Sequence, residues 1–187
     1  MTQSAEALTT RTGTWTIDPT HSSLDFTVRH AMVAKVRGRF TDFTGTLRLD
    51  DERPERSSAE VAVQLASVDT GNPQRDEHLR TGDFFEVETF PTMTFVSTDA
   101  SARGDDGYSL TGDLTIHGVT KPVRFDVTLQ GTALDPFGNE RIGFEGSTTI
   151  SRKDWGLTWN APLEAGAGVL VSDKVAITLD VSAIRQQ

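Results

Sequence analysis

Alternation of apolar and polar residues recurs along almost the whole chain, and it constrains the fold more than any other feature. Leu24, Phe26 and Val28 alternate with polar neighbours, and the same period of two recurs around 61–65, 110–116, 123–129 and 175–181. A period of two is typical of a β-strand with one apolar and one solvated face. Strands of this kind belong to antiparallel sheets, so we predict an all-β barrel or sandwich with an apolar interior.

Breaks in the alternation divide the chain into extended segments and one main insertion. A kink is expected within 36–51, because the apolar phase changes between Phe40 and Phe43, as one inserted residue would cause. Residues 72–80 break the pattern ahead of Phe84 and Phe85, and they predict one or two short helices. The nine extended segments are 14–18, 22–30, 36–51, 57–67, 92–102, 108–117, 119–135, 138–151 and 174–184, from which we predict about eight strands in the wall. We expect one domain over 13–187, preceded by a disordered tail at 1–12.

Strand number and length together indicate what the interior can hold. An eight-stranded antiparallel barrel is just wide enough to be filled by side chains or to hold one small ligand. Several segments run ten to sixteen residues, which at ~3.3 Å per residue extends them to roughly 35–50 Å. A tall, narrow, apolar lumen suits a long thin ligand. The alternative, a lumen filled by Phe, Leu and Val, stays open at this point.

Composition narrows the classes of partner. The chain has no cysteine, so disulfides, thiolate metal sites and cysteine nucleophiles are excluded. A net charge of −9 and a pI near 4.8 disfavour nucleic acid and anionic membrane surfaces as partners. No stretch is long enough for stable membrane insertion, and the first residues lack a basic flank before an apolar run. We therefore expect a cytoplasmic protein that handles a small molecule.

The sequence carries no strong signature of catalysis. The histidines are scattered, and neither a zinc-binding HExxH nor a nucleophile-elbow G-x-S-x-G motif occurs, so we predict no metal, no cofactor and no catalytic residue. Lys35, Arg37 and Arg39 share one face of a strand, where they form either a solvated surface or a rim that attracts anions. Arg75 and His78, on the insertion before the Phe pair, predict a polar mouth above the apolar interior.

Several motifs occur in an order that goes beyond composition. They are Asp18-Pro19-Thr20-His21-Ser22, Arg75-Asp76-Glu77-His78-Leu79 before Phe84-Phe85, Phe90-Pro91-Thr92-Met93, His117-Gly118-Val119-Thr120-Lys121-Pro122, and Ser151-Arg152-Lys153-Asp154-Trp155-Gly156-Leu157. Over about 14–182 the chain thereby resembles the YceI-like family of bacterial polyisoprenoid-binding proteins. The resemblance implies an extended lipocalin-like antiparallel barrel, no enzymatic activity, and often a homodimer. It also implies a polyisoprenoid ligand, in some members a quinone or prenyl phosphate, and many relatives are periplasmic.

The sequence therefore predicts a carrier or storage protein for a long-chain isoprenoid or related amphiphilic lipid. Two alternatives remain open: an enzyme acting on a lipid-like isoprenoid inside the barrel, and a filled barrel that acts as a stress-related interaction module. The polar mouth is predicted at His30, Arg75 and His78. The predicted ligand-binding residues of the lumen and its opening are Phe26, Val28, Phe40, Phe43, Val63, Leu65, Phe84, Phe85, Phe95, Leu114, Phe125, Phe144 and Trp155.

Overall fold

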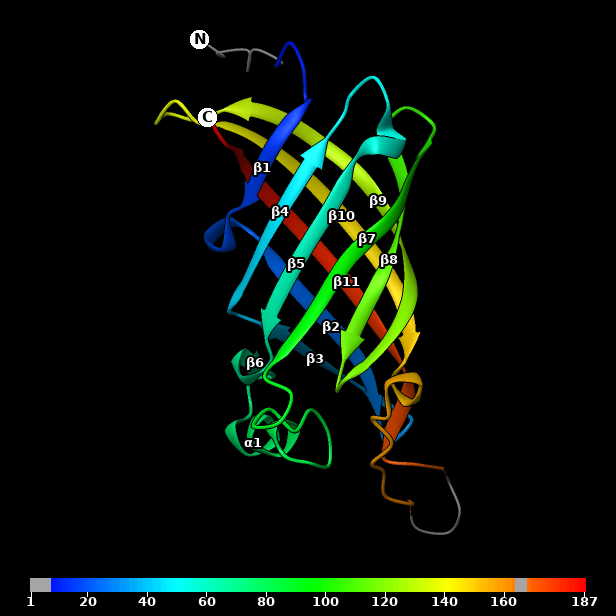
Figure 1. The fold of residues 1–187 in the computed structure, drawn as a ribbon. Coiled ribbons are helices and arrows are strands. Elements are labelled where there is room, and N and C mark those ends of the chain that lie inside the picture. Colours follow the sequence, from blue (N-terminus) through cyan, green and yellow to red (C-terminus); the bar gives the residue numbers. More distant parts are fainter. Residues whose placement is uncertain (1–7, 164–167) are drawn as a thin grey trace.

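In the computed structural model, residues 8–163 and 168–187 are described, and their strands form a single sheet closed by pairing of β1 with β11 (Figure 1). The strands are β1 (Gly13–Ile17), β2 (Ser23–His30), β3 (Ala34–Phe40), β4 (Phe43–Leu49), β5 (Ser58–Gln64), β6 (Val68–Asp69), β7 (Thr92–Arg103), β8 (Gly107–Ile116), β9 (Val119–Leu134), β10 (Glu140–Ser151) and β11 (Val171–Arg185). The α-helix is α1 (Pro73–Arg80), and the 3₁₀ turns are η1 (Pro19–His21), η2 (Pro54–Arg56), η3 (Leu65–Ser67) and η4 (Arg152–Trp155).

Six of the eleven strands form three broken strands, so the wall of the barrel has eight positions. Strand β1 continues into β2 across η1, β3 continues into β4, and β5 continues into β6 across η3. Every pairing between neighbours is antiparallel. The predicted fold class, an eight-stranded antiparallel barrel with a short helix, is confirmed.

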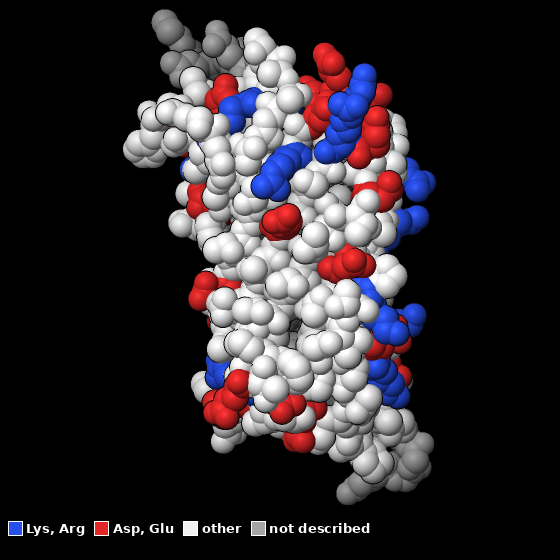
Figure 2. Space-filling view, viewed as in Figure 1, with Lys and Arg blue, Asp and Glu red and all other residues white. Residues whose placement is uncertain are grey.

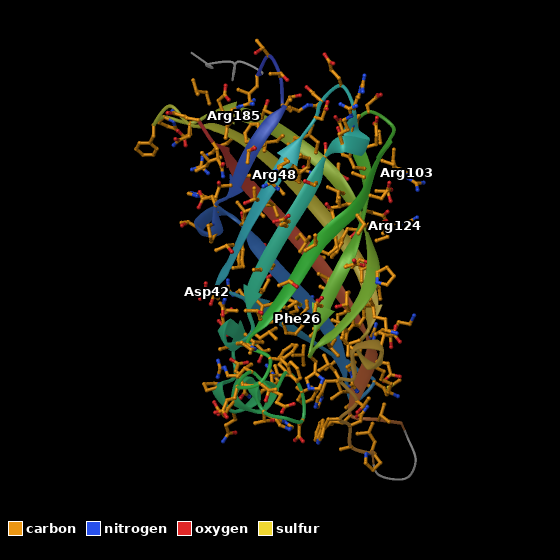
Figure 3. All side chains as sticks on the ribbon, viewed as in Figure 1. Phe26, Asp42, Arg48, Arg103, Arg124 and Arg185 are labelled. Atoms are coloured by element: carbon orange, nitrogen blue, oxygen red, sulfur yellow. The ribbon has the colours of Figure 1, made fainter. Side chains whose placement is uncertain are left out.

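The kink expected within 36–51 is the junction between β3 and β4. Thr41 and Asp42 leave the ladder there, and both backbone N–H groups donate to the Ser67 hydroxyl, at 3.1 Å each. The side chain of Asp42 lies at this junction, at the edge of the barrel (Figure 3). The change of apolar phase in the sequence therefore marks a real interruption of the strand, not a continuous bulged one.

Alternation along the strands separates an apolar inside from a solvated outside. Phe26 lies on the inner side of the wall, whereas Arg103 and Arg124 point outwards (Figure 3). Acidic and basic side chains lie close to one another on the outer face drawn in Figure 2. Gly38 makes room for the ring of Phe26 opposite it, because a Cβ at residue 38 would lie 2.3 Å from that ring. The absence of a side chain at residue 38 therefore lets the Phe26 ring fit against the wall.

The two ends of the barrel differ. The β2–β3 turn, α1 with its flanking loops, the β8–β9 turn and the β10–β11 connection lie at one end, named the α1 end from here on (Figure 1). The other end carries the β4–β5, β7–β8 and β9–β10 turns.

Of the predicted N-terminal tail, residues 1–7 lie outside the described residues. Arg11 and Thr12 of that segment both hydrogen-bond to Asp51 at the second end.

Candidate functional site

A cavity of about 660 Å³ lies inside the barrel. Its lining runs from Arg11 and Tyr108 at one end to Arg75 and His78 at the α1 end. The barrel is therefore not plugged by its own side chains, and the filled-barrel alternative loses its structural basis. Volumes of this size are typical of sites for small organic ligands.

Most predicted lumen residues line this cavity. These are Phe26, Val28, Phe40, Val63, Phe84, Phe85, Phe95, Leu114, Phe125 and Phe144, and the three residues predicted for the polar mouth, His30, Arg75 and His78, line it as well. They come from β2, β3, β5, β7, β8, β9, β10 and α1 with the loop behind it. Residues far apart in sequence thus meet on one apolar surface because their strands pair in the register that alternation requires.

Phe43, Leu65 and Trp155 do not line the cavity, although each is buried. Phe43 is the first residue of β4 after the break, and it packs within the core. Leu65 lies in η3, where the chain leaves the sheet, so strand alternation no longer sets its direction. Trp155 lies in η4 and donates from its indole Nε1 to the Leu114 carbonyl, 2.9 Å away. Its role in the described structure is to fasten η4 to the barrel.

Other lining residues were not singled out from the sequence. The apolar ones on strands belong to the alternating segments and were only left out of the predicted ligand-binding set, among them Leu24, Val36, Val61, Leu110, Val127, Ile177, Leu179 and Val181. Trp159 lies in the connection between β10 and β11, where no periodic pattern exists. Arg11 falls in the segment expected to be a disordered tail. These two could be found only from the tertiary structure.

Helix α1 forms one side of the polar mouth. Asn72 caps the helix by accepting from the Arg75 backbone N–H at 3.1 Å, and Pro73 occupies the first turn. The buried Asp76 carboxylate accepts from the backbone N–H and hydroxyl of Thr70, at 2.9 and 2.5 Å. Arg75 donates from Nε and Nη2 to the Thr70 hydroxyl and carbonyl, at 2.7 and 2.8 Å. The guanidinium is thus held in one orientation beside the cavity.

His78 joins α1 to the opposite side of the mouth. Its Nε2 lies 2.7 Å from the Asp83 carboxylate. The imidazole packs edge-on against Phe84 and Trp159, with ring centroids 5.1 and 4.7 Å away.

In the described part of the chain, β3 pairs with a second strand only at Arg39 and Phe40, so its α1-end half is a free edge facing this mouth.

The β10–β11 connection is held by a buried arginine. Arg152 is 4% exposed and donates to the carbonyls of Leu157, Trp159, Val171 and Ser172. Burial lowers the pKa of Arg152, and the Asp173 carboxylate opposes that shift. Because these hydrogen bonds fix the backbone around Trp159, Arg152 sets the shape of this side of the mouth.

The N-terminal segment around Arg11 borders the opposite end of the cavity. Arg11 donates from Nε to Asp51 at 2.6 Å, and the Trp15 indole donates to the Arg11 carbonyl at 3.0 Å. This hydrogen-bonded ion pair raises the pKa of Arg11 and lowers the pKa of Asp51. Arg185 donates to the carbonyls of Thr10 and Thr12, at 2.5 Å each. The segment is therefore held at this end of the barrel, where Arg11 lines the cavity, whereas the polar mouth lies at the other end.

Comparison with known proteins places the chain in a family. The model of the YceI-like domain matches residues 15–183. The chain belongs to the YceI-like family. The UPF0312 proteins of Pseudomonas paraeruginosa and of Pectobacterium atrosepticum are 40% and 41% identical to it, over 89% and 74% of this chain and 83% and 71% of theirs.

Solved YceI-like structures share the architecture. BcnA of Burkholderia cenocepacia superposes with a TM-score of 0.78 at 24% identity, covering 89% of this chain and 98% of that one. The YceI protein of Campylobacter jejuni gives 0.73 at 30% identity, covering 85% and 90%. A polyisoprenoid binding domain from Saccharophagus degradans, implicated in plant cell wall breakdown, gives 0.70 at 21% identity, covering 92% and 98%. The antiparallel barrel of this YceI-like chain is thus a recurrent fold.

Two motif histidines of this YceI-like chain stabilise turns. His21 Nδ1 lies 2.8 Å from Asp18 at η1, and His117 Nε2 lies 3.2 Å from Glu86 at the β8–β9 turn. His30 and His78 are the two that reach the cavity. Among the described residues, no three His, Asp or Glu side chains are grouped so that they could hold a metal ion. Within the same residues, no helix is long and apolar enough to span a membrane.

Proposed function

We propose that this protein binds a long-chain isoprenoid or a related amphiphilic lipid inside the barrel and acts as its carrier or store. The observation that carries the proposal is the cavity, which extends between the two ends of the barrel along apolar walls. An apolar site with few convergent polar groups selects a ligand that is mostly hydrocarbon. A narrow barrel selects one that is long and thin.

The polar mouth suits the head group of such a lipid. Arg75 uses two of its five N–H donors on Thr70, so three remain. An arginine fixed in this way can donate to a phosphate oxygen or to a quinone carbonyl. His30 on β2 and His78 on α1 add hydrogen-bonding groups to the lining of the same cavity. We therefore place the head group at the α1 end and the hydrocarbon tail in the barrel.

Binding energy favours tight but unselective capture of the tail. At ~0.8 kcal/mol per buried methylene, a tail of tens of carbons gains more than the ~20 kcal/mol at which non-covalent affinities saturate. Ordering the tail and losing translational freedom offset much of this gain. One added methylene then changes affinity little, so the polar mouth is expected to provide selectivity.

The comparisons support a binding role and this class of cargo. The YceI-like family is a family of binding barrels, and the Saccharophagus degradans domain of the same fold is described as polyisoprenoid-binding. Catalysis would need a group that titrates beside the reacting atoms of the lipid. The titratable side chains we assign to ligand contact, His30 and His78, lie at the mouth, where they suit head-group binding.

The direct test is to identify the bound lipid. Protein purified without detergent is extracted with organic solvent, and the extract is analysed by mass spectrometry. Delipidated protein is then titrated with a prenyl alcohol or prenyl phosphate, with tryptophan fluorescence as the readout, because Trp159, one of three tryptophans, lines the cavity. We expect a prenyl lipid in the extract and saturable uptake. An extract free of lipid, together with no uptake of either compound, would refute the proposal.

A further inference from the structure

Exposed apolar side chains gather at the α1 end, beside the polar mouth. Met32 and Val33 in the β2–β3 turn are 53% and 82% exposed, and Val169 of the β10–β11 connection is 40% exposed. The two segments touch, since Ala31 donates its N–H to the Leu170 carbonyl at 2.8 Å and Met32 lies against Gly168. They lie together at this end of the barrel in Figure 1. We name Met32, Val33 and Val169 the apolar tip.

The backbone of the turn is costly for the residues that occupy it. Ala31 and Met32 have φ values of 49° and 65°, and Val33 donates its N–H to the His30 carbonyl at 3.1 Å. In this turn of three residues between the paired His30 and Ala34, the left-handed backbone at residues 31 and 32 favours Asn and Gly, whereas Cβ-bearing Ala and Met are strained in it. Strained backbone of this kind is concentrated at functional sites. Here the strained turn exposes the side chains of Met32 and Val33 to solvent.

A cationic surface flanks the apolar tip. Arg29 and Lys35 lie directly opposite each other on β2 and β3, a like-charge pair that costs stability, and Arg37 is the next outward residue on β3. Lys174 of β11 is exposed beside the Val175–Val28 pair. Among the residues that the structure describes, none of these four forms an ion pair. We name Arg29, Lys35, Arg37 and Lys174 the cationic face.

The net charge of the chain does not describe this surface. The chain carries −9 overall, but residues 26–41 contain four Arg or Lys and no carboxylate. Asp173 nearby is already paired with Arg152 and Lys153, and on the α1 side Glu77 pairs with Arg80. Because salt screens charges beyond ~8 Å at physiological ionic strength, a docking surface responds to its local charge.

We propose that the apolar tip and the cationic face dock the protein on an anionic lipid bilayer. Apolar side chains enter the boundary between head groups and acyl chains, while the cations meet the negative lipid head groups. His30, Leu170 and Val171, next to the tip in sequence, line the cavity, so docking presents the polar mouth to the membrane. This inference rests on the proposed function, since it states where the lipid cargo is exchanged.

The test measures docking without cargo. Delipidated protein is sedimented with vesicles of phosphatidylcholine, with or without phosphatidylglycerol. We expect binding only to the anionic vesicles, weakened by high salt. Lys35→Gln with Arg37→Gln should bind about 25-fold more weakly, at about fivefold per cation removed. Replacing the turn by Ala31→Asn, Met32→Gly and Val33→Ser should also weaken binding while raising the melting temperature, because it relieves the strained backbone.

Matched controls lie elsewhere on the barrel. Phe137 in the β9–β10 turn is 88% exposed at the opposite end, and Arg124 is an exposed cation on β9. Phe137→Ser and Arg124→Gln should bind anionic vesicles like the wild type. The proposal is overturned if the wild type ignores anionic vesicles, if the turn variant binds them equally well, or if the controls lose binding as the test variants do.

A second readout separates this proposal from the proposed function. Prenyl lipid is offered either in detergent micelles or within anionic vesicles. Docking variants should load from micelles like the wild type but extract lipid from vesicles more slowly. If wild-type protein sediments with vesicles but takes up lipid from neither source, the assignment of a prenyl lipid as cargo is wrong and the docking proposal still holds. Loading from vesicles at equal rates in all variants would refute the docking proposal alone.

Discussion

Gly146→Phe should block the cavity without unfolding the barrel. Gly146 lies on β10 and lines the cavity. A Cβ at this residue would lie 3.4 Å from Leu179 Cδ1 and 3.6 Å from Val127 Cγ2, which are ordinary contacts. Its φ is not in the left-handed region, so a larger residue is compatible with the backbone. A phenylalanine there therefore projects its ring into the space that we assign to the lipid tail.

The expected loss of affinity follows from the hydrocarbon that the ring displaces. If the ring excludes one isoprene unit of five carbons, the lipid loses about 4 kcal/mol of burial at ~0.8 kcal/mol per carbon, which sets an upper limit of about a thousandfold on the rise in Kd. Folding should not suffer, because replacing glycine in a strand interior removes a penalty of about 0.5–1 kcal/mol. The assay is titration of delipidated protein with a prenyl lipid, alongside thermal unfolding.

Ser147→Phe is the matched control. It places the same ring on the adjacent residue of β10, which is exposed on the outer face. We expect wild-type affinity from Ser147→Phe and a large loss from Gly146→Phe, at similar melting temperatures. Equal affinities in two folded variants would refute the assignment of the cavity as the binding site.

Three contacts give predictions about stability. Gly38→Val should destabilise the barrel by about 1–3 kcal/mol in urea unfolding, because a Cβ at residue 38 would lie 2.3 Å from the Phe26 ring. Arg152→Met should cost about 3 kcal/mol and speed amide exchange in the β10–β11 connection, since carbonyls there lose a buried donor. A hydrogen bond from Arg141 lowers the pKa of Asp18 to about 2. The ionised Asp18 carboxylate therefore stabilises the fold fully above the pKa that Asp18 has in the unfolded chain, and this stabilisation is lost as the pH falls through about 2. The stability gap between wild type and Asp18→Asn, from urea unfolding at each pH, should shrink over that range.

Each of these expectations has an outcome that contradicts it. Gly82→Ala is the control for Gly38→Val, because a Cβ at residue 82 would meet nothing within 4 Å; equal stabilities of the two variants would contradict the steric argument. Unchanged amide exchange in Arg152→Met would show that its hydrogen bonds do not hold the connection. A pH-independent gap for Asp18→Asn would mean that the Arg141 contact contributes nothing.

Alternation in the sequence was enough to predict strands and their inward faces. Phe26, Val28 and Phe125 were placed correctly on the cavity wall because side chains in a strand alternate between two faces whatever the strand packs against. The change of phase between Phe40 and Phe43 was also visible, since it is a local property, but it predicted a bulge within one strand, and the structure breaks the strand there. Leu65 and Trp155 do not line the cavity, because they lie in 3₁₀ turns where period two no longer sets direction, and Phe43 at the start of β4 does not line it either.

The sequence by itself determined that the chain forms an antiparallel sheet with one apolar face, because apolar and polar residues alternate along each strand. Only the tertiary structure decided that this face encloses space. A barrel is hollow or filled according to its strand number, its stagger and the reach of side chains across its width, and these depend on all strands at once. The same holds for the ends, where Arg11 and Trp159 come to border the cavity from segments with no periodic signal.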